Sequence, residues 1–322
     1  MKAIRAAQTG EPEVMTLHEL PTPAPGAHQL LVRVEAAGVN FIDIYHRTGA
    51  YTLPLPLALG LEGAGIIEAV GEAAHGFRVG ERVAWSAAPG SYATHVLVAA
   101  EKAVPVPASI DGRTAAATML QGMTAHYLVG STYPLKAGET CIIHAGAGGV
   151  GLLLTQMAKR VGARVITTVS TEEKAALSRA AGADIVVRYT RDDFVAAAKE
   201  ATGGRGVQVV YDSVGQTTFD AGLRALAPRG MFVLFGQSSG PVPPFELQRL
   251  AAGGSLYVTR PTLVNYTETR EELMGRAGQL FQWIDAGKLA IRIGATFPLA
   301  DAAAAHRALA SRATTGKVLL LP

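Results

Sequence analysis

The chain has 322 residues, of which 49% are hydrophobic and 17% charged, and its formal net charge is +3. This composition excludes an intrinsically disordered chain, and the 36 glycines follow no collagen-like period. The single cysteine, Cys141, excludes an internal disulfide and any zinc, haem or iron–sulfur site built from several cysteines. The net charge is too weak to predict a nucleic-acid partner. Neither a signal peptide nor a membrane span is expected, which favours a cytoplasmic protein.

The first part of the chain, from Met1 to about Gln121, predicts a β-rich domain. Its apolar runs are short and are divided by proline and glycine, as in 20–26. Alternating apolar and polar residues follow, and they indicate strands at 29–35, 65–70 and 81–85. Short strands at this spacing are typical of a barrel-like or sandwich domain.

From Thr140 onward, strands alternate with helices. Helical patterns cover Val150–Val161 and Glu172–Ala181, and a glycine follows each of them. Continuous apolar strands separated by helices predict an α/β fold with a doubly wound parallel sheet of six strands. The six expected strands are Thr140–Ala145, Arg164–Ser170, Ile185–Tyr189, Val207–Val214, Gly230–Gly236 and Ser255–Thr262.

The end of the chain contains one long amphipathic helix, Glu271 to about Ala286, and a closing apolar strand at 316–321. We interpret this tail as a return to the first domain. The expected domains are therefore 1–122 with 266–322, which form a discontinuous β-rich domain, and 123–265, which form the α/β domain with the doubly wound sheet.

A glycine-rich loop follows the first strand of the second domain. Gly146, Gly148 and Gly151 form a G-x-G-x-x-G motif directly before a helix. In such a motif the first glycine permits a tight turn, the second lets backbone N–H groups approach a pyrophosphate, and the third allows helix and strand to pack closely. The helix N-terminus adds partial positive charge. The motif therefore predicts dinucleotide binding.

The end of the second strand of this domain selects the dinucleotide. An enzyme that uses NAD commonly places an acidic residue there, whereas this strand ends in Ser170, with Lys174 four residues later. A hydroxyl and an ammonium group would hold a 2′-phosphate, so the sequence favours NADP. Ser170 is also expected to be a helix N-cap, with Glu173 as the third residue of a capping box, and Lys174 could equally be a plain exposed helix lysine.

Several motifs in chain order resemble the NADPH-dependent quinone oxidoreductases, the zeta-crystallin-like, zinc-independent branch of the medium-chain dehydrogenase/reductase superfamily. The resemblance covers essentially the whole chain. The motifs are Asn40-Phe41-Ile42-Asp43, Gly148-Gly149-Val150-Gly151, Val210-Tyr211-Asp212-Ser213-Val214-Gly215, Phe235-Gly236-Gln237-Ser238-Ser239 and Ser311-Arg312-Ala313-Thr314.

This resemblance implies a GroES-like catalytic domain, a Rossmann domain and a cleft between them for nicotinamide and substrate. It also implies a homodimer formed through the edge strand at Ser255–Thr259. On the nicotinamide side, the resemblance implies contacts from Phe41, Ile42 and Asp43, from Thr124 and Tyr127 on the helix that enters the second domain, and from Ser213, Phe235, Gly236 and Ser238. It implies that Gly149 and Val150 bind the pyrophosphate, that Ser170 and Lys174 bind the 2′-phosphate, and that Tyr189 contacts the adenosine. Arg312 is implied to lie over the cofactor. Tyr189 could instead be a strand-end tyrosine, and Arg312 a surface arginine.

The chain departs from the zinc-dependent alcohol dehydrogenases of the same superfamily. Those enzymes carry a catalytic cysteine and a Gly-His-Glu motif, and the matching stretch here is Gly60-Leu61-Glu62-Gly63. Leucine cannot bind zinc, and no His-rich zinc motif is present. We therefore expect an acceptor that takes hydride without a metal, such as a quinone or an activated enone.

The expected acceptor site contains Asn40 as a hydrogen-bond donor, with Tyr45 and Tyr51 as donors or stacking partners for a flat ring. The two tyrosines could also simply pack at the edge of the cleft. His144 and Asp212 are expected to be structural, and Cys141 to be an inert core residue. Two alternatives to a quinone reductase remain open: a zinc-independent enone or enoyl-thioester reductase, and an NADPH-binding structural or RNA-binding protein.

Overall fold

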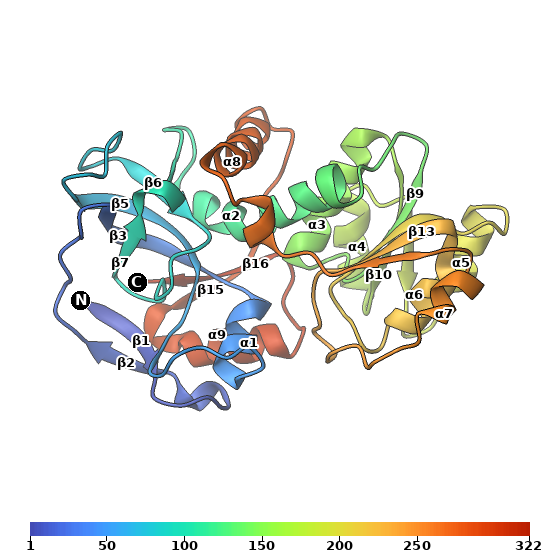
Figure 1. Ribbon diagram of the computed structural model, residues 1–322, viewed down its shortest axis with the longest axis horizontal. Coiled ribbons are helices and arrows are strands. Elements are labelled where there is room, and N and C mark those ends of the chain that lie inside the picture. Colours follow the sequence, from blue (N-terminus) through green and yellow to red (C-terminus); the bar gives the residue numbers. More distant parts are fainter. The chain divides into compact units, whose positions relative to one another are not determined.

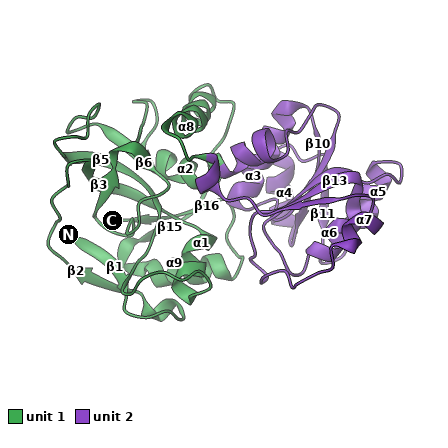
Figure 2. Ribbon diagram, in the orientation of Figure 1, with its two compact units in different colours: residues 1–123, 267–322 green, residues 124–266 purple.

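Two separate sets of strands divide the chain into two units, and the computed structural model describes all residues, 1–322. Unit 1 consists of Met1–Met123 and Thr267–Pro322, and unit 2 of Thr124–Tyr266 (Figure 2). Unit 1 therefore contains both ends of the chain. None of the helices is both long enough and apolar enough to cross a membrane.

Strand β3 (Gln29–Val39) is the centre of the larger sheet of unit 1 (Figure 1). It pairs in antiparallel fashion with β5 (Glu62–Val70), β7 (His95–Ala99) and β16 (Lys317–Leu321). The sheet has the order β15-β16-β3-β5-β6-β8, with β7 also on β3. The closing strand of the chain, β16, therefore lies directly beside β3. The other strands of this sheet are β6 (Arg82–Trp85), β8 (Val104–Pro105) and β15 (Ile293–Pro298).

A smaller sheet and four helices complete unit 1. The smaller sheet has the order β2-β1-β4, formed by β1 (Lys2–Ala6), β2 (Thr16–Glu19) and β4 (Leu57–Ala58). The helices are α1 (Phe41–Thr48), α2 (Gly112–Tyr127, whose last turn belongs to unit 2), α8 (Arg270–Asp285) and α9 (Ala302–Ala310), with 3-10 turns η1 (Pro12–Val14), η2 (Ala100–Lys102) and η5 (Leu299–Asp301).

Helix α1 begins where β3 ends, and this junction has a clear local cause. Asn40 is the N-cap in an extended conformation, and Gly49 ends the helix with φ +81°, the left-handed conformation that favours glycine. The apolar side of α1 and α9 packs on a core that includes Trp85 and Tyr92, both fully buried. Because the core fixes α1 and β3 fixes its start, residues 40–43 have a defined position in unit 1.

Unit 2 is a doubly wound sheet of six strands, as predicted. Its order is β11-β10-β9-β12-β13-β14, and every pairing is parallel. The order reverses between β9 and β12, which is the topological switch point where such sheets bind ligands. The strands are β9 (Thr140–Ile143), β10 (Arg164–Val169), β11 (Ile185–Arg188), β12 (Val207–Asp212), β13 (Leu226–Leu234) and β14 (Tyr257–Thr259).

All six strand predictions for unit 2 were wrong in their bounds. Strands β9, β10, β11 and β12 begin where expected but end one or two residues earlier. Strand β13 begins at Leu226 rather than at Gly230. The edge strand β14 covers only Tyr257–Thr259, because Ser255 has φ +58° and its left-handed backbone lies outside the strand. The helices of unit 2 are α3 (Gly149–Val161), α4 (Glu172–Ala180), α5 (Phe194–Ala201), α6 (Phe219–Ala225) and α7 (Gln248–Ala252), with a π-helical turn η3 (Leu128–Thr132) and a 3-10 turn η4 (Leu263–Tyr266).

Candidate active site

The glycine loop of unit 2 joins β9 to α3 at the carboxyl edge of the sheet. A Cβ atom at Gly151 would lie 2.3 Å from the carbonyl oxygen of Ala145, so only glycine allows this close approach of helix and strand. A Cβ atom at Gly148, the N-cap of α3, would meet only that same oxygen, at 3.2 Å. The loop lies directly before the N-terminus of a 13-residue helix, where backbone N–H groups attract an anion.

The first glycine of the motif, Gly146, lies in the turn between β9 and α3. The left-handed residue of the turn is Ala145, with φ +53°, and Gly146 has no such conformation. Gly146 is required by packing instead, because its Cβ atom would lie 2.6 Å from Cβ of Thr167 and 2.9 Å from Oγ of Ser178.

Ser170, Lys174 and Tyr189 follow the next two strands of the sheet. Lys174 Nζ donates to Ser170 Oγ at 3.4 Å, so the hydroxyl and the ammonium group lie together. Ser170 is not the helix N-cap: Thr171 is, and its Oγ accepts from the backbone N–H of Lys174 at 3.3 Å. The strand ends at Val169, one residue earlier than expected, and the cap lies one residue later than expected. Tyr189 directly follows β11 and is 50% exposed.

The residues that follow β12 and β13 lie side by side. The backbone N–H of Ser238 donates to the carbonyl of Ser213 at 3.1 Å, and the N–H of Phe235 donates to the carbonyl of Asp212 at 2.8 Å. A Cβ atom at Gly236 would lie 2.7 Å from the Ser213 carbonyl oxygen. This set of predicted cofactor contacts is therefore assembled at one edge of the sheet.

Three residues expected to be structural have structural contacts. The Asp212 carboxylate accepts from the backbone N–H groups of Val214 and Gly215 at 2.5 and 3.1 Å. His144 is buried, and its Nδ1 lies 2.8 Å from Thr168 Oγ1. Cys141 is buried within β9, where burial raises the pKa of its thiol to about 12.

The end of α2 carries Thr124 and Tyr127, and both side chains are largely buried. The Tyr127 ring stacks on that of Tyr266, with centroids 4.2 Å apart and planes 6° from parallel. This contact joins the first and last segments of unit 2, and the sequence analysis did not identify it.

Helix α1 of unit 1 carries an aromatic cluster. The rings of Tyr45 and Tyr51 meet edge to face with centroids 5.2 Å apart, and Phe41 lies 6.3 Å from Tyr45. Both tyrosines are half-buried, so each ring keeps an accessible part. Ile42 is half-buried on the same helix, and Arg312 is exposed after α9, with φ +58°.

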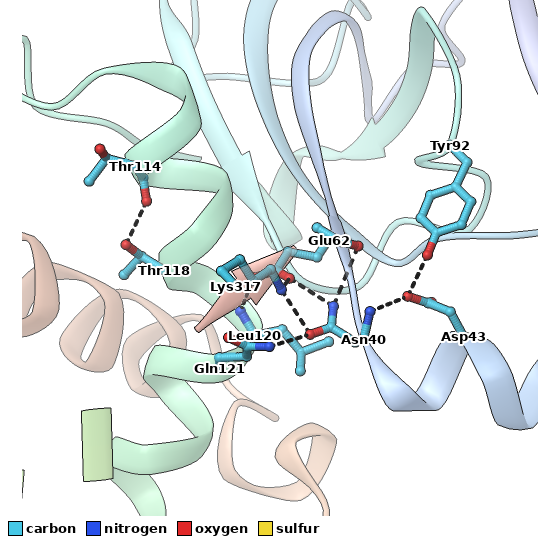
Figure 3. A network of polar contacts seen from close by, with 10 residues as sticks. Asn40, Asp43, Glu62, Tyr92, Thr114, Thr118, Leu120, Gln121 and Lys317 are labelled. Carbon is cyan, nitrogen blue, oxygen red and sulfur yellow. Dashed lines mark hydrogen bonds and ion pairs between the residues drawn. The ribbon is translucent and has the colours of Figure 1, made fainter. Parts of the chain in front are cut away.

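Asn40 is held by a buried network at the end of β3 (Figure 3). Its Oδ1 accepts from Lys317 Nζ at 2.8 Å, and its Nδ2 donates to Glu62 Oε2 at 2.8 Å. Lys317 and Glu62 are also an ion pair, with side chains 1% and 0% exposed. The second contact of Nδ2, to the carbonyl of Gly38, is 3.5 Å long and therefore weak.

A second network lies under the start of α1. Asp43 Oδ2 accepts from the backbone N–H of Asn40 at 2.8 Å and from the Tyr92 hydroxyl at 2.9 Å. The Tyr92 oxygen lies 3.1 Å from Nε2 of His306. Burial raises the pKa of Asp43 to about 7, although the Asn40 and Tyr92 hydrogen bonds and the Lys317 charge oppose this shift. Burial, together with the Arg47 charge, lowers the pKa of His306 to about 3.

Two family models match the chain. Residues 26–108 match the "Alcohol dehydrogenase GroES-like domain", and residues 149–277 match the "Zinc-binding dehydrogenase". A GroES-like domain joined to a doubly wound nucleotide-binding sheet defines the class of medium-chain dehydrogenases/reductases.

Individual relatives narrow this class. A quinone oxidoreductase of Pseudomonas aeruginosa is 47% identical over 323 residues, which is 100% of this chain and 99% of the relative. A 2-haloacrylate reductase of a Burkholderia species is 41% identical over 97% of this chain and 96% of its own. The crystal structure of Escherichia coli quinone oxidoreductase complexed with NADPH superposes with a TM-score of 0.98, at 43% identity and with both chains fully covered. The chain belongs to the quinone oxidoreductase family, which confirms the resemblance found in the sequence.

The residues present do not fit the zinc ion that the second family description implies. Leu61 stands before Glu62, and both carboxylate oxygens of Glu62 accept hydrogen bonds, Oε1 from the backbone N–H of Leu120 at 2.5 Å. Cys141 lies inside β9. No group of three or more His, Cys, Asp or Glu side chains is placed to hold a metal.

The sequence did not reveal the roles of four buried polar residues, which are Lys317, Tyr92, His306 and Glu62. For Glu62, the contact with Asn40 was not predicted. A signal was present for Lys317, because it is the one charge in an otherwise apolar closing strand. A charge is buried only when it is paired, so a partner had to exist. Which residue is the partner of Lys317 depends on strand register, which places Glu62 opposite Gly38 and Val318 opposite Val39.

Because the pKa of Asp43 is raised, we expect the stability of the fold to depend on pH. The folded chain keeps its proton up to about pH 7, whereas the unfolded chain loses it near the ordinary pKa of 3.8. Its contribution to stability is therefore greatest below about pH 4 and falls as the pH rises to about 7. Asp43→Asn mimics the protonated form, so the variant should gain stability over the parent across this window, by at most about 4 kcal/mol.

Urea unfolding of the parent and of Asp43→Asn at pH 5 and pH 8 measures this difference. Both chains contain His306, whose lowered pKa destabilises the fold in acid, between about pH 6.5 and 3; comparison at equal pH removes this effect. A stability difference that is the same at both pH values would contradict the assigned protonation of Asp43.

Proposed function

We propose that this protein is an enzyme that reduces quinones with NADPH, without a metal ion. The observation that carries the proposal is the glycine loop at the carboxyl end of β9, which lies at the switch point of the sheet of unit 2. Backbone N–H groups at the start of α3 suit a pyrophosphate. The likeness to a quinone oxidoreductase solved with NADPH supports the same assignment.

In the proposed cofactor site, residues at the ends of the strands of the unit 2 sheet bind successive parts of NADPH. Gly149 and Val150 bind the pyrophosphate, Ser170 and Lys174 bind the 2′-phosphate, and Tyr189 lies at the adenosine. The nicotinamide side is assigned to Thr124, Tyr127, Ser213, Phe235, Gly236 and Ser238, and Arg312 covers the cofactor. When bound, NADPH supplies the reducing equivalents.

The acceptor is assigned to the start of α1, and Phe41, Ile42 and Asp43 are assigned as contacts of the nicotinamide. Reduction of a quinone places negative charge on its oxygen. The second N–H of Asn40 makes only a weak contact with Gly38, and we assign it as the donor to that oxygen. Tyr45 and Tyr51 provide a surface for the flat ring. A delocalised oxyanion needs less stabilisation than an alkoxide, which is consistent with a site that holds no zinc ligands.

One observation favours a second candidate substrate. A relative that is 41% identical over nearly the whole chain is a 2-haloacrylate reductase. The activated double bond of a 2-haloacrylate resembles that of an enone, because it can accept a hydride and then a proton. An activated alkene is therefore the alternative acceptor for the same site.

A steady-state assay with NADPH distinguishes the candidates. The acceptors are 1,4-benzoquinone, an enone such as cyclohexenone, and 2-chloroacrylate, each with and without a chelator. We expect the highest kcat/KM with the quinone and no effect of the chelator. Higher turnover of the alkene would favour the second candidate. No oxidation of NADPH with any acceptor would favour a protein that binds NADPH for a structural or RNA-binding role.

Lys174 should determine the choice of cofactor. A charge-assisted contact contributes about 1.5–3 kcal/mol, so Lys174→Ala should weaken NADPH binding by roughly ten- to a hundredfold and leave NADH binding nearly unchanged. Fluorescence titration with both nucleotides measures this, with Lys199→Ala on α5 as the control. Equal losses for NADPH and NADH would show that Lys174 does not contact the 2′-phosphate.

Variants of Tyr45 and Tyr51 should distinguish a stacking role of the two rings from a hydrogen-bonding role of their hydroxyl groups. Each Phe variant keeps the ring and should remain fairly active; a hydroxyl bonded to the developing oxyanion would instead cost roughly ten- to a thousandfold in kcat. Tyr45→Ala and Tyr51→Ala remove the ring as well and should raise KM for the quinone without changing NADPH affinity. Unchanged kcat and KM in both Ala variants would place the acceptor elsewhere.

We further propose a homodimer in the cytoplasm, formed through the edge of the unit 2 sheet. Strand β14 pairs only with β13, and Tyr257 on it is 56% exposed. An unprotected edge of this kind is otherwise an aggregation risk. Light scattering should give twice the mass of one chain, and Tyr257→Asp should halve it, whereas Val79→Asp, at an exposed apolar position in unit 1, should not. A monomeric parent would contradict the dimer.

A further inference from the structure

The buried ion pair of unit 1 contacts the residue assigned as the hydrogen-bond donor. Lys317 and Glu62 come from β16 and β5, and the pairing of both strands with β3 brings them to the end of β3 where Asn40 begins α1. Figure 3 shows both charged groups directed at the Asn40 amide, and Gln121 Nε2 on α2 also donates to Asn40 Oδ1, at 3.3 Å.

An amide group alone can be turned over, with oxygen and nitrogen exchanged, at little cost. Here the ammonium of Lys317 can only donate, and the carboxylate of Glu62 can only accept. Exchange of the two ends of the Asn40 amide would place its NH₂ against the ammonium and its oxygen against the carboxylate. The pair therefore fixes the amide in one orientation and leaves one N–H without a strong partner.

The Lys317 contact also polarises the amide. Hydrogen bonds to ionised groups are stronger than neutral ones, and they strengthen further in a surrounding from which water is excluded. The Lys317 and Glu62 side chains are almost completely buried. The remaining N–H is thus part of a conjugated amide whose oxygen faces a positive charge at 2.8 Å, which makes that N–H a better donor.

The network has no free space for rearrangement. A Cβ atom at Gly38 would lie 2.1 Å from Glu62 Oε2 and 2.8 Å from Lys317 Nζ, so the backbone of β3 closes the network on one side. Glu62 Oε1 is fixed on the other side by the backbone N–H of Leu120 on α2.

From these contacts we infer that Lys317 and Glu62 are positioning residues for the reaction, which act through Asn40 by fixing and polarising its amide. The inference rests on the proposed function, since it assigns the purpose of a network around the proposed donor. Lys317 and Glu62 touch neither acceptor nor cofactor in this account.

The test is a cycle of variants measured with NADPH and 1,4-benzoquinone. The main variant is Glu62→Gln with Lys317→Met, which removes both charges together and leaves no unpaired buried ion. It should lower kcat roughly ten- to a hundredfold and leave the Kd for NADPH within about threefold of the parent. In the Asn40→Ala background the same two substitutions should change kcat by less than about twofold, because their effect passes through Asn40.

A control and a second variant separate positioning from stability. Arg82→Met removes the Arg82–Glu35 pair of the same unit, which is 2.8 Å long and does not contact Asn40; it should lower the unfolding temperature without lowering kcat. Gly38→Ala retains both charges but displaces the Glu62 carboxylate, and should lower kcat as the main variant does. Gly38→Ala therefore keeps the inference testable if the main variant fails to fold.

A readout without cofactor completes the test. In the NMR spectrum of the nucleotide-free protein, the side-chain NH₂ signals that disappear in Asn40→Ala should exchange slowly with solvent, and should exchange at least about tenfold faster in the main variant because its fixed partners are lost. The inference would be overturned if the two substitutions lowered kcat as much in the Asn40→Ala background as in the parent. A main variant that changes stability but changes neither kcat nor exchange would also overturn it. Absence of turnover by the parent would instead overturn the proposed function.

Discussion

The buried contact between Lys317 and Glu62 connects the two segments of the chain that form unit 1. Lys317 is contributed by the closing strand and Glu62 by the second strand that pairs with β3, so the pair forms only when unit 1 has recovered its C-terminal segment. Removal of one partner of such a pair typically costs about 3–5 kcal/mol, whereas replacement of both by apolar residues is often neutral. Stability alone therefore gives no strong reason for charges at this place, whereas the fixed orientation of Asn40 does.

The same end of β3 is connected to a second network through the backbone of Asn40. Its N–H donates to Asp43, which is hydrogen-bonded to Tyr92 and, through it, is next to His306 on α9. The side chain and main chain of one residue are thus held by two different sets of buried polar groups. In the proposed acceptor site, the hydrogen-bond donor is therefore held at both its side chain and its main chain.

The sequence predicted most of the architecture because its signals are local. The G-x-G-x-x-G motif, the alternation of strands and helices and the absence of zinc ligands at Leu61 each depend on a few neighbouring residues. Partners distant in the chain were not predictable in this way: Lys317 lies 255 residues from Glu62, and only strand register brings them together. Small errors of strand and helix bounds also occurred: β10 ends at Val169, the helix cap is Thr171 rather than Ser170, and the left-handed Ser255 lies outside β14.

The central claim is that the glycine loop of unit 2 binds NADPH and that Asn40 donates to the acceptor. A crystal structure of the protein with NADPH and a non-reducible quinone analogue tests it most directly. The account predicts the pyrophosphate at the N-terminus of α3, the 2′-phosphate within hydrogen-bond distance of Ser170 and Lys174, and an oxygen of the analogue on Asn40 Nδ2. A nucleotide bound away from the glycine loop, or an analogue that contacts neither Asn40 nor the tyrosines of α1, would contradict it.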